Sequence, residues 1–404
     1  RAAPRRSPTH HRMPELPEVE AQRRTIEAAT VGKQIASLLT LEQGGGPRDG
    51  LYDDKVIAEG VTAAALTASL QERWVVAVRR RGKQLWLELG ATRGGGCTGC
   101  LLLHFGMTGA VIVRGVAAPL YKSFAIDDSV WPPRFTKLEI VLSGDVRLAY
   151  TDPRRFGRVL LRGADPFVSP PLSALAADPI TDPPSLETFA AGLRRLKAPV
   201  KAALLDQGRL VCGVGNWVAD EVLYQANVLP SAPCNTLSDA QIAATHAQVL
   251  AICTAACASQ ADGGRLPSGW LFHHRWAKQT TGSIESPLGR IHFDTVGGRT
   301  TAFLPSRQKK GEATPNQKKG EATPKQKKGQ ADPKQKQGQA DPKQKQGQAD
   351  PKQKQGQADP KQKQGQADPD QKQGQADPKQ KQGQADPKQK QGQADPKQKQ
   401  GQAD

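Results

Sequence analysis

The chain has 404 residues, with 57 Lys and Arg against 39 Asp and Glu, and a net charge of +18. The last 97 residues hold 22 lysines and 12 acidic residues but no Val, Ile, Leu, Phe, Trp, Tyr or Met. Residues 308–404 repeat a nine-residue unit. Because they have no apolar surface to offset the entropy of ordering, they are predicted to form a disordered tail. The preceding 307 residues suffice for two packed domains. They contain no run of about 18 apolar residues, so no membrane span is expected and a soluble protein is predicted.

Six cysteines lie at positions 97, 100, 212, 234, 253 and 257. The Cys97 and Cys100 pair has no second pair at the spacing of a zinc knuckle, so neither a metal nor another cofactor is expected. Cys253 and Cys257 are four residues apart in an apolar pattern, which places them on one face of a predicted helix.

Residues 1–12 hold four Arg, two His and no acidic residue, which fits an organelle-targeting remnant or untranslated sequence. A helix is predicted from Pro17 to about Gly32, with Val19, Ile26 and Ala29 on one face. From about 35 to 161, short apolar runs broken by Gly, Pro and Asp predict an antiparallel β domain.

The second part of the chain is predicted to be helical. A Pro-rich stretch at 165–184 marks the boundary, and Ser185 begins a helix. Further helices are expected at about 201–206, just after Asn216, and from the capping box at 238–241. Residues 289–305 then predict a two-stranded hairpin. The fold class is α+β, with expected domains at 13–165, 180–265 and 266–307 between the leader 1–12 and the tail 308–404.

The most informative dipeptide is Pro14-Glu15. Proline is the residue whose α-amine is secondary, so a free N-terminal Pro14 is a nucleophile that can form an iminium with a sugar carbon. The neighbouring Glu15 can act as a general acid or base. The alternative is that Pro14 and Pro17 only precede a helix, where proline is common.

The heptapeptide PELPEVE at 14–20 resembles the N-terminus of the formamidopyrimidine-DNA glycosylase and endonuclease VIII family. Segments 54–57, 82–87, 215–226 and 297–303 resemble its plant-type branch. The resemblance implies an N-terminal antiparallel β-sandwich with an N-terminal helix, then a helix-two-turn-helix domain and a β-hairpin finger. Where zinc-containing members have cysteines, this chain has Leu304 and Arg307, so the finger is expected to be zincless.

The resemblance also assigns catalytic roles. Pro14 would attack C1′ of a damaged nucleoside, and Glu15 would protonate the sugar and assist proton transfer. Lys83, in a bend after three arginines, would hold a cation over the phosphate or the sugar. Its alternative is a solvated lysine at a strand end. Strand scission would follow by β- and δ-elimination from the Schiff base.

DNA contacts are implied in the same way. Three side chains on two loops would fill the void left by an extruded nucleotide, namely Met107, Arg154 and Phe156. Each could equally be a core or surface residue. Three others would grip phosphates, namely Lys201, Asn216 and Arg299, with Glu221 bracing the site. Arg299 could instead be an ordinary solvated arginine of the hairpin. The glycine-rich turn 213–216 precedes a helix whose N-terminal N–H groups could accept a phosphate.

The leading hypothesis is therefore a monomeric, bifunctional DNA glycosylase and AP lyase. Its expected partner is double-stranded DNA containing oxidised purines or abasic sites, with formamidopyrimidine as the first substrate and 8-oxoguanine as a second candidate.

Met13 is the working initiator, because its removal, or proteolysis after organelle import, exposes Pro14. The nucleus is the expected location, with a plastid or mitochondrion as the alternative. If Pro14 stays internal, the chain is expected to bind damaged DNA without cutting it; an RNA- or ribosome-associated protein is a further rival.

Overall fold

The computed structural model describes residues 13–117, 130–276 and 282–311. The leader 1–12 and residues 312–404 lie outside the described residues, so the predictions made for them stay predictions. The first residues of the predicted tail are described and ordered: Gln308 is 2% exposed and its side chain donates to the Val228 carbonyl (2.9 Å), and the Lys309 N–H donates to the Asn227 carbonyl (2.9 Å).

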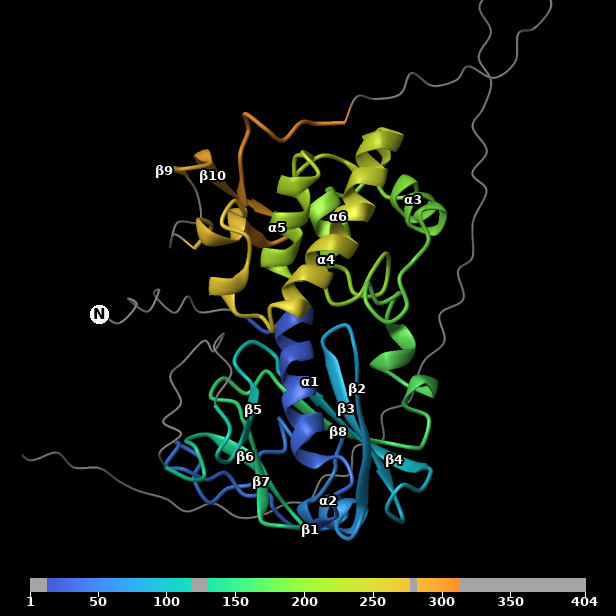
Figure 1. Cartoon of the computed structure of the whole chain (residues 1–404), viewed down its shortest axis with the longest axis vertical. Helices are drawn as coiled ribbons and strands as arrows, with labels where there is room; N and C mark the ends of the chain where they lie inside the picture. Colours follow the sequence, from blue (N-terminus) through green and yellow to red (C-terminus); the bar gives the residue numbers. More distant parts are fainter. Residues whose placement is uncertain (1–12, 118–129, 277–281, 312–404) are drawn as a thin grey trace, which may run out of the picture. The chain divides into compact units, whose positions relative to one another are not determined.

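The first element is α1 (Leu16–Thr30), as predicted from its apolar spacing. Glu15 precedes it, and the Glu15 N–H donates to the Glu18 carboxylate (3.0 Å), which anchors the first turn. Val19 and Ile26 are fully buried. In Figure 1, α1 runs alongside the strands and reaches α6 (Asp239–Ala258). It contacts α6 and three strands, β2 (Trp74–Arg81), β3 (Gln84–Gly90) and β5 (Ala110–Val113). One helix thus packs against both parts of the fold.

Two four-stranded antiparallel sheets form the predicted β-sandwich. The first has the order β2-β3-β4-β8 and consists of β2 (Trp74–Arg81), β3 (Gln84–Gly90), β4 (Cys97–His104) and β8 (Arg158–Arg162). The second has the order β1-β6-β7-β5 and consists of β1 (Ile35–Leu39), β6 (Thr136–Leu142), β7 (Val146–Thr151) and β5 (Ala110–Val113). Their inner faces share one apolar core, to which Leu87 and Ile140 belong. The α+β prediction with an antiparallel sandwich is confirmed.

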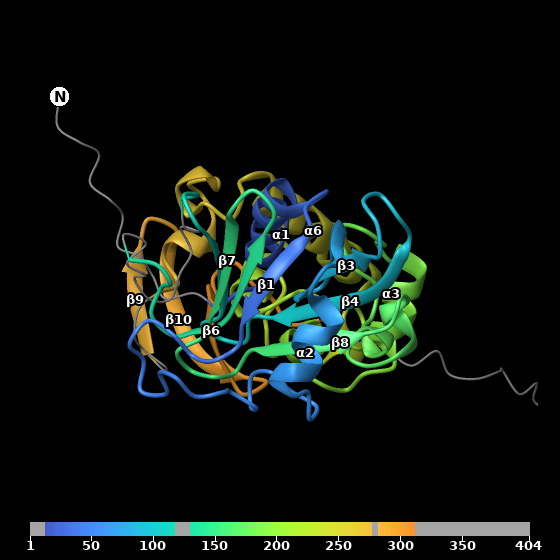
Figure 2. The ribbon, with the colours of Figure 1, turned by 90° about the horizontal axis from the view of Figure 1, so that it is seen from below.

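One helix in this region was not predicted. α2 (Ala63–Leu70) lies next to β1, as Figure 2 shows. The Thr62 side chain accepts a hydrogen bond from the Ala65 N–H (3.1 Å), and Leu66 and Leu70 are buried. The surrounding pattern of short apolar runs favoured strands, whereas a threonine cap before an alanine-rich segment starts a helix.

A bulge at the start of β4 brings two thiols together. Gly90 pairs with Cys97 and Leu89 with Gly99, so Thr98 is an extra residue in the ladder. Residues three apart on a regular strand point to opposite faces, but here the Sγ atoms of Cys97 and Cys100 are 3.6 Å apart. Among residues 13–117, 130–276 and 282–311, no group of three or more His, Cys, Asp or Glu side chains could hold a metal ion.

Four helices form the second core, and all were predicted near their observed positions. They are α3 (Leu186–Arg194), α4 (Val200–Leu205), α5 (Asn216–Gln225) and α6 (Asp239–Ala258). Ser238 and Gln241 form the expected capping box, and Cys253 and Cys257 are buried on α6. By length and composition alone α6 could cross a membrane. Here it packs against α1, α3 and α5, and its buried face belongs to the helical core.

The C-terminal region is a three-stranded sheet rather than the predicted two-stranded hairpin. Its strands are β9 (Gly282–Ser286), β10 (Gly289–Val296) and β11 (Arg299–Phe303), in the order β11-β10-β9. β9 was missed because its sequence, GSIES, has a single apolar residue, Ile284. An apolar cluster holds the sheet against α5 and a short 3-10 helix, η5 (Leu271–His273). Its buried members are Tyr224, Leu271, Ile291, Phe293, Ala302 and Leu304.

Candidate active site

Glu15 lies where the start of α1 meets the start of α5. The Leu16 N–H donates to the Gly213 carbonyl (3.1 Å), which joins the two segments. The Glu15 carboxylate accepts hydrogen bonds from the N–H groups of Trp217 (2.9 Å) and Val218 (3.1 Å). These N–H groups have no partner within α5, and a negative charge is favoured there. The groups expected to receive a DNA phosphate are therefore occupied by Glu15, which corrects the prediction for the turn at 213–216.

Glycines allow this close approach. A Cβ added to Gly215 would lie 2.2 Å from Cδ of Glu15, and one added to Gly213, at φ +90°, would lie 2.5 Å from Cδ1 of Leu16. Gly82, at φ +55°, lies against Cys212, with a built Cβ 3.0 Å from its side chain. Three glycines thus let the turn before α5 touch both α1 and the turn between β2 and β3.

Pro14 and Lys83 lie at the same junction. Pro14 is buried directly before Glu15, and while Met13 is attached its nitrogen is an amide. Burial lowers the pKa of Lys83, Glu15 opposes that effect, and the positive charge of Arg299 adds to it. Burial raises the pKa of Glu15, and the nearby Lys83 cation acts in the opposite direction. The backbone gives the same placement: a Cβ built on Gly82, the residue before Lys83, would lie 3.0 Å from the Gly213 nitrogen, and Gly213 accepts the hydrogen bond of Leu16, the residue after Glu15.

His104 belongs to this site, although the sequence reasoning used it only as the first residue of a loop motif. It is the last residue of β4 and is paired in register with Gln84 and Arg158. Burial, followed by the charges of Lys83 and Arg158, lowers the pKa of His104 to about 4. Near neutral pH the imidazole is therefore uncharged, on a strand position paired with Gln84, the residue after Lys83.

Lys201 is completely buried and does not present a free cation to solvent. Its ammonium forms an ion pair with Asp220 (2.6 Å) and donates to the Thr301 hydroxyl (2.8 Å) and the Thr300 carbonyl (3.1 Å). Three partners use all three donors of an ammonium group. Lys201 thus joins α4 to β11, and its predicted grip on a phosphate stays a prediction.

Asn216 reaches the same point on β11. Its side-chain N–H donates to the Thr300 carbonyl (3.0 Å), the group that also accepts from Lys201. Asp220, which the sequence reasoning did not single out, also pairs with Arg275 (2.6 Å) and accepts from the Ala302 N–H (3.0 Å). The start of β11, where Arg299 is exposed, is thereby fixed to α4 and α5.

Glu221 supports η5. Its carboxylate accepts from the N–H groups of Leu271 (3.3 Å) and Phe272 (2.7 Å) and from the Gln225 side chain (2.8 Å). Burial raises the pKa of Glu221 to about 7. The bracing predicted for Glu221 is thus directed at the 3-10 helix that precedes the third sheet.

Comparisons with known proteins match this arrangement. The family model of the formamidopyrimidine-DNA glycosylase N-terminal domain matches residues 13–159, and that of the formamidopyrimidine-DNA glycosylase H2TH domain matches residues 175–268. The chain belongs to the formamidopyrimidine-DNA glycosylase family. The family resemblance seen in the sequence is confirmed.

Two curated relatives show the extent of the similarity. The chain is 37% identical to the formamidopyrimidine-DNA glycosylase of Arabidopsis thaliana over 298 residues, which cover 74% of this chain and 71% of the relative. It is 33% identical to the enzyme of that name from Thermus thermophilus over 313 residues, which cover 74% of this chain and 100% of the relative.

Solved structures of the family are similar as well. The Lactococcus lactis formamidopyrimidine-DNA glycosylase bound non-covalently to DNA containing an AP site matches with a TM-score of 0.56 at 27% identity, covering 73% of this chain and 100% of that chain. A mutant of the same bacterial protein with DNA containing Fapy-dG matches with a TM-score of 0.57 at 28% identity, covering 74% and 100%.

Two loops of this formamidopyrimidine-DNA glycosylase family member bring the predicted void-filling residues together. A Cβ on Gly106 would lie 2.5 Å from the backbone of Phe156, so the loop carrying Met107 touches the loop carrying Arg154 and Phe156. Phe156 is 45% exposed, and the Arg154 guanidinium lies over its ring at 5.1 Å. Met107 is half-buried. Phe156 is therefore not a core residue, which was one alternative for it. The role of the three side chains in DNA binding stays a prediction.

Buried contacts hold these loops in place. Asp152 accepts from the Thr108 hydroxyl and from the Gly157 N–H, both at 2.7 Å. Arg155, at φ +57°, turns inward and pairs with the buried Asp53 at 2.8 Å. Its two neighbours in the sequence, Arg154 and Phe156, are exposed.

Proposed function

We propose that this member of the family is a bifunctional DNA glycosylase and AP lyase of base excision repair. Its proposed substrate is double-stranded DNA containing oxidised purines, with formamidopyrimidine first and 8-oxoguanine second, or abasic sites. The observation that carries the proposal is the position of Pro14 next to Glu15, whose buried carboxylate lies near the Lys83 cation. The proposal requires removal of residues 1–13, because only a free proline nitrogen is nucleophilic.

The chemistry follows from these groups. The lone pair of the Pro14 amine attacks C1′, and the bond from C1′ to the base breaks, so that the base leaves with the bonding electrons. The Pro14 nitrogen then loses its N–H proton, and the departing base takes up a proton. Glu15 donates a proton to the sugar ring oxygen as the ring opens and the iminium forms. Burial raises the pKa of Glu15, which favours the protonated acid that this step needs.

The iminium then promotes strand scission. It withdraws electrons from the sugar, so a proton leaves C2′ and the bond from C3′ to its phosphate oxygen breaks, which is β-elimination. Loss of a second proton, from C4′, breaks the bond from C5′ to its phosphate oxygen, which is δ-elimination. Water hydrolyses the remaining imine and releases Pro14. Lys83 and Arg299 are proposed to hold the phosphates and to stabilise the negative charge that develops on them.

DNA contacts complete the proposal. Met107, Arg154 and Phe156 are proposed to occupy the gap left by the extruded nucleotide, since two loops present them together. Lys201, Asn216 and Arg299 are proposed to contact phosphates, and Lys201 also holds β11 through Thr300 and Thr301. The apolar cluster around Leu304 is proposed to organise a zincless finger. We further propose a monomer located in the nucleus, or in a plastid or mitochondrion if the leader directs import.

Borohydride trapping tests the central step. Protein beginning at Pro14 and protein beginning at Arg1 would each be incubated with duplex DNA containing one abasic site, then reduced. We expect a covalent adduct from the Pro14 protein alone, and a much slower reaction in its Glu15→Gln variant. Equal adduct from the Arg1 protein, free of processed chains, would refute the proline mechanism.

A second function would follow if residues 1–13 stay attached to Pro14. The Pro14 nitrogen is then an amide, and an amide cannot form a Schiff base. If the leader is retained, we propose a protein that binds damaged DNA without cleaving it. Binding of abasic DNA without adduct by both proteins would support this function.

A further inference from the structure

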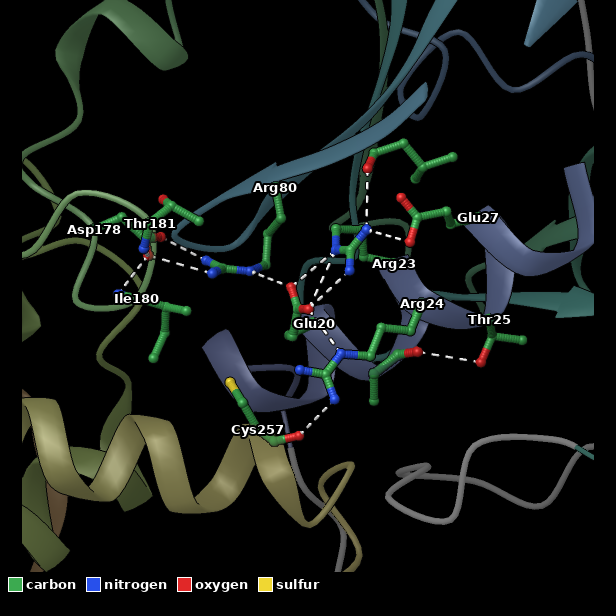
Figure 3. A network of polar contacts seen from close by, with 12 residues as sticks. Glu20, Arg23, Arg24, Thr25, Glu27, Arg80, Asp178, Ile180, Thr181 and Cys257 are labelled. Atoms are coloured by element: carbon green, nitrogen blue, oxygen red, sulfur yellow. Dashed lines mark hydrogen bonds and ion pairs between the residues drawn. The ribbon is translucent and has the colours of Figure 1, made fainter. Parts of the chain in front are cut away.

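A buried arginine joins the sandwich to the segment between the two cores. Arg80, near the end of β2, is 4% exposed, and Figure 3 shows its side chain between two carboxylates. Its Nε donates to Glu20 on α1 (3.0 Å), and its Nη1 donates to Asp178 (2.5 Å). Asp178 follows the short 3-10 helix η2 (Leu172–Ala174) and precedes α3. The segment predicted as a domain boundary is therefore tied into the interior by an ion pair.

Asp178 also grips the turn between β2 and β3. Its Oδ2 accepts from the Gly82 N–H at 2.7 Å, and the Gly82 carbonyl accepts from Arg80 Nη1 at 3.1 Å. Its Oδ1 accepts from the N–H groups of Ile180 (2.9 Å) and Thr181 (3.0 Å), as Figure 3 shows. The carboxylate is thus fixed by its own segment, and the backbone of Gly82 is held through both its donor and its acceptor.

Lys83 is the residue that follows Gly82. Because Asp178 and Arg80 fix the Gly82 backbone, they determine where the Lys83 side chain begins. Gly82 also lies against Cys212 in the turn before α5, so the glycine has little room to shift. A fixed backbone at Gly82 sets the position from which the Lys83 side chain extends, and so limits the places that its amino group can reach.

We propose that Asp178 is a positioning residue that sets the place of Lys83 relative to Glu15, an inference that rests on the proposed function. Asp178 does not touch substrate; it acts through the Gly82 backbone. Burial tends to raise the pKa of Asp178, but Arg80 and the N–H donors outweigh burial and lower it, so the carboxylate stays ionised near neutral pH. The charge that holds Arg80 and Gly82 is therefore present under working conditions.

A matched pair of variants tests the proposal in protein beginning at Pro14. Asp178→Asn keeps the shape of the side chain but loses its charge. Asp182→Asn is the control, because Asp182 lies in the same segment and pairs with Arg81, but its side chain is 62% exposed. We expect single-turnover adduct formation on abasic DNA to slow by about 10- to 100-fold in Asp178→Asn, with less than about threefold change in DNA affinity. Asp182→Asn should react within about twofold of the parent.

A double-mutant cycle separates positioning from general damage. If Asp178 acts through Lys83, Asp178→Asn should cause no further loss of rate in a Lys83→Ala background. An equal loss in both backgrounds, or no loss in either, would overturn the proposal. If Asp178→Asn does not fold, Arg80→Lys removes the contact with the Gly82 carbonyl while keeping a cation, and it should show the same dependence on Lys83.

Hydrogen exchange gives a readout that does not depend on catalysis. The Gly82 amide should be protected in the parent and in Asp182→Asn, and should exchange at least about tenfold faster in Asp178→Asn. Unchanged exchange at Gly82 would overturn the positioning role even if the rate falls. Absence of adduct in the parent would refute the proposed function, and the Gly82 exchange would still show whether Asp178 holds the turn.

Discussion

Replacement of Gly215 by alanine should unseat the Glu15 carboxylate. An added Cβ would lie 2.2 Å from Cδ and 2.6 Å from Oε1 of Glu15, whereas ordinary contacts are 3.4–4 Å. Gly215 has φ −119°, a conformation open to alanine, so the clash alone decides the outcome. To relieve it, the carboxylate must move by about 1 Å, away from the N–H groups that it accepts.

The size of the effect follows from the contacts that are lost. Glu15 accepts two backbone hydrogen bonds, from Trp217 and Val218. Each contributes about 0.5–1.5 kcal/mol when the carboxyl is neutral and about 1.5–3 kcal/mol when it is ionised. Partial relaxation would retain some of this energy, so we expect the free energy of unfolding to fall by about 3 kcal/mol. That is a large part of the roughly 5–15 kcal/mol typical of a folded domain.

Urea unfolding and borohydride trapping would measure the effect. Gly269→Ala is the matched control, because no atom lies within 4 Å of its built Cβ, and its stability should stay within about 0.5 kcal/mol of the parent. Gly215→Ala should be destabilised and should form adduct much more slowly. Stability and adduct formation equal to those of the control would refute the placement of Glu15 at the start of α5.

Three further predictions concern other parts of the fold. Since burial raises the pKa of Glu221 to about 7 from 4.5, its protonation stabilises the fold fully below pH 4.5, and this contribution is lost as the pH rises through 7. The unfolding free energy of Glu221→Gln minus that of the parent should therefore rise by up to about 3 kcal/mol between pH 4.5 and pH 8. Urea titrations in which this difference does not change with pH would contradict the prediction. Leu304→Ala should destabilise the third sheet by about 2–4 kcal/mol and weaken DNA binding. A zinc chelator should leave DNA binding by the parent unchanged, and loss of binding with the chelator would argue against a zincless finger. Of the six cysteines, Cys97 alone is not buried, so it should react first with a thiol reagent in the folded protein, as peptide mass spectrometry would show; faster labelling at another cysteine would contradict the burial pattern.

Local signals predicted most of the helices. The apolar spacing of α1 and the Ser238 capping box of α6 act within one or two turns, so the sequence contains the whole pattern. α2 and β9 were missed because α2 lies among short apolar runs and β9 has one apolar residue. The existence of β9 depends on its pairing with β10, which local propensity does not describe.

The candidate site depends on contacts between distant residues. Glu15 and Trp217 are 202 residues apart, and the glycines between which Glu15 fits were interpreted as a turn for phosphate. The family resemblance assigned Lys201 to a phosphate, but no sequence signal indicated that it is buried and paired with Asp220. Asp178 had no sequence signal other than its place in a Pro-rich segment. Residue types indicated the chemistry, whereas the partners of each charge required the fold.

The most direct test of the proline mechanism is to find the residue that carries the DNA adduct. Protein beginning at Pro14 would be trapped with borohydride on abasic DNA, digested with protease and nuclease, and sequenced by tandem mass spectrometry. The reduced sugar should be attached to the nitrogen of Pro14 in the N-terminal peptide. Attachment to Lys83 or another lysine, with Pro14 unmodified, would contradict the mechanism.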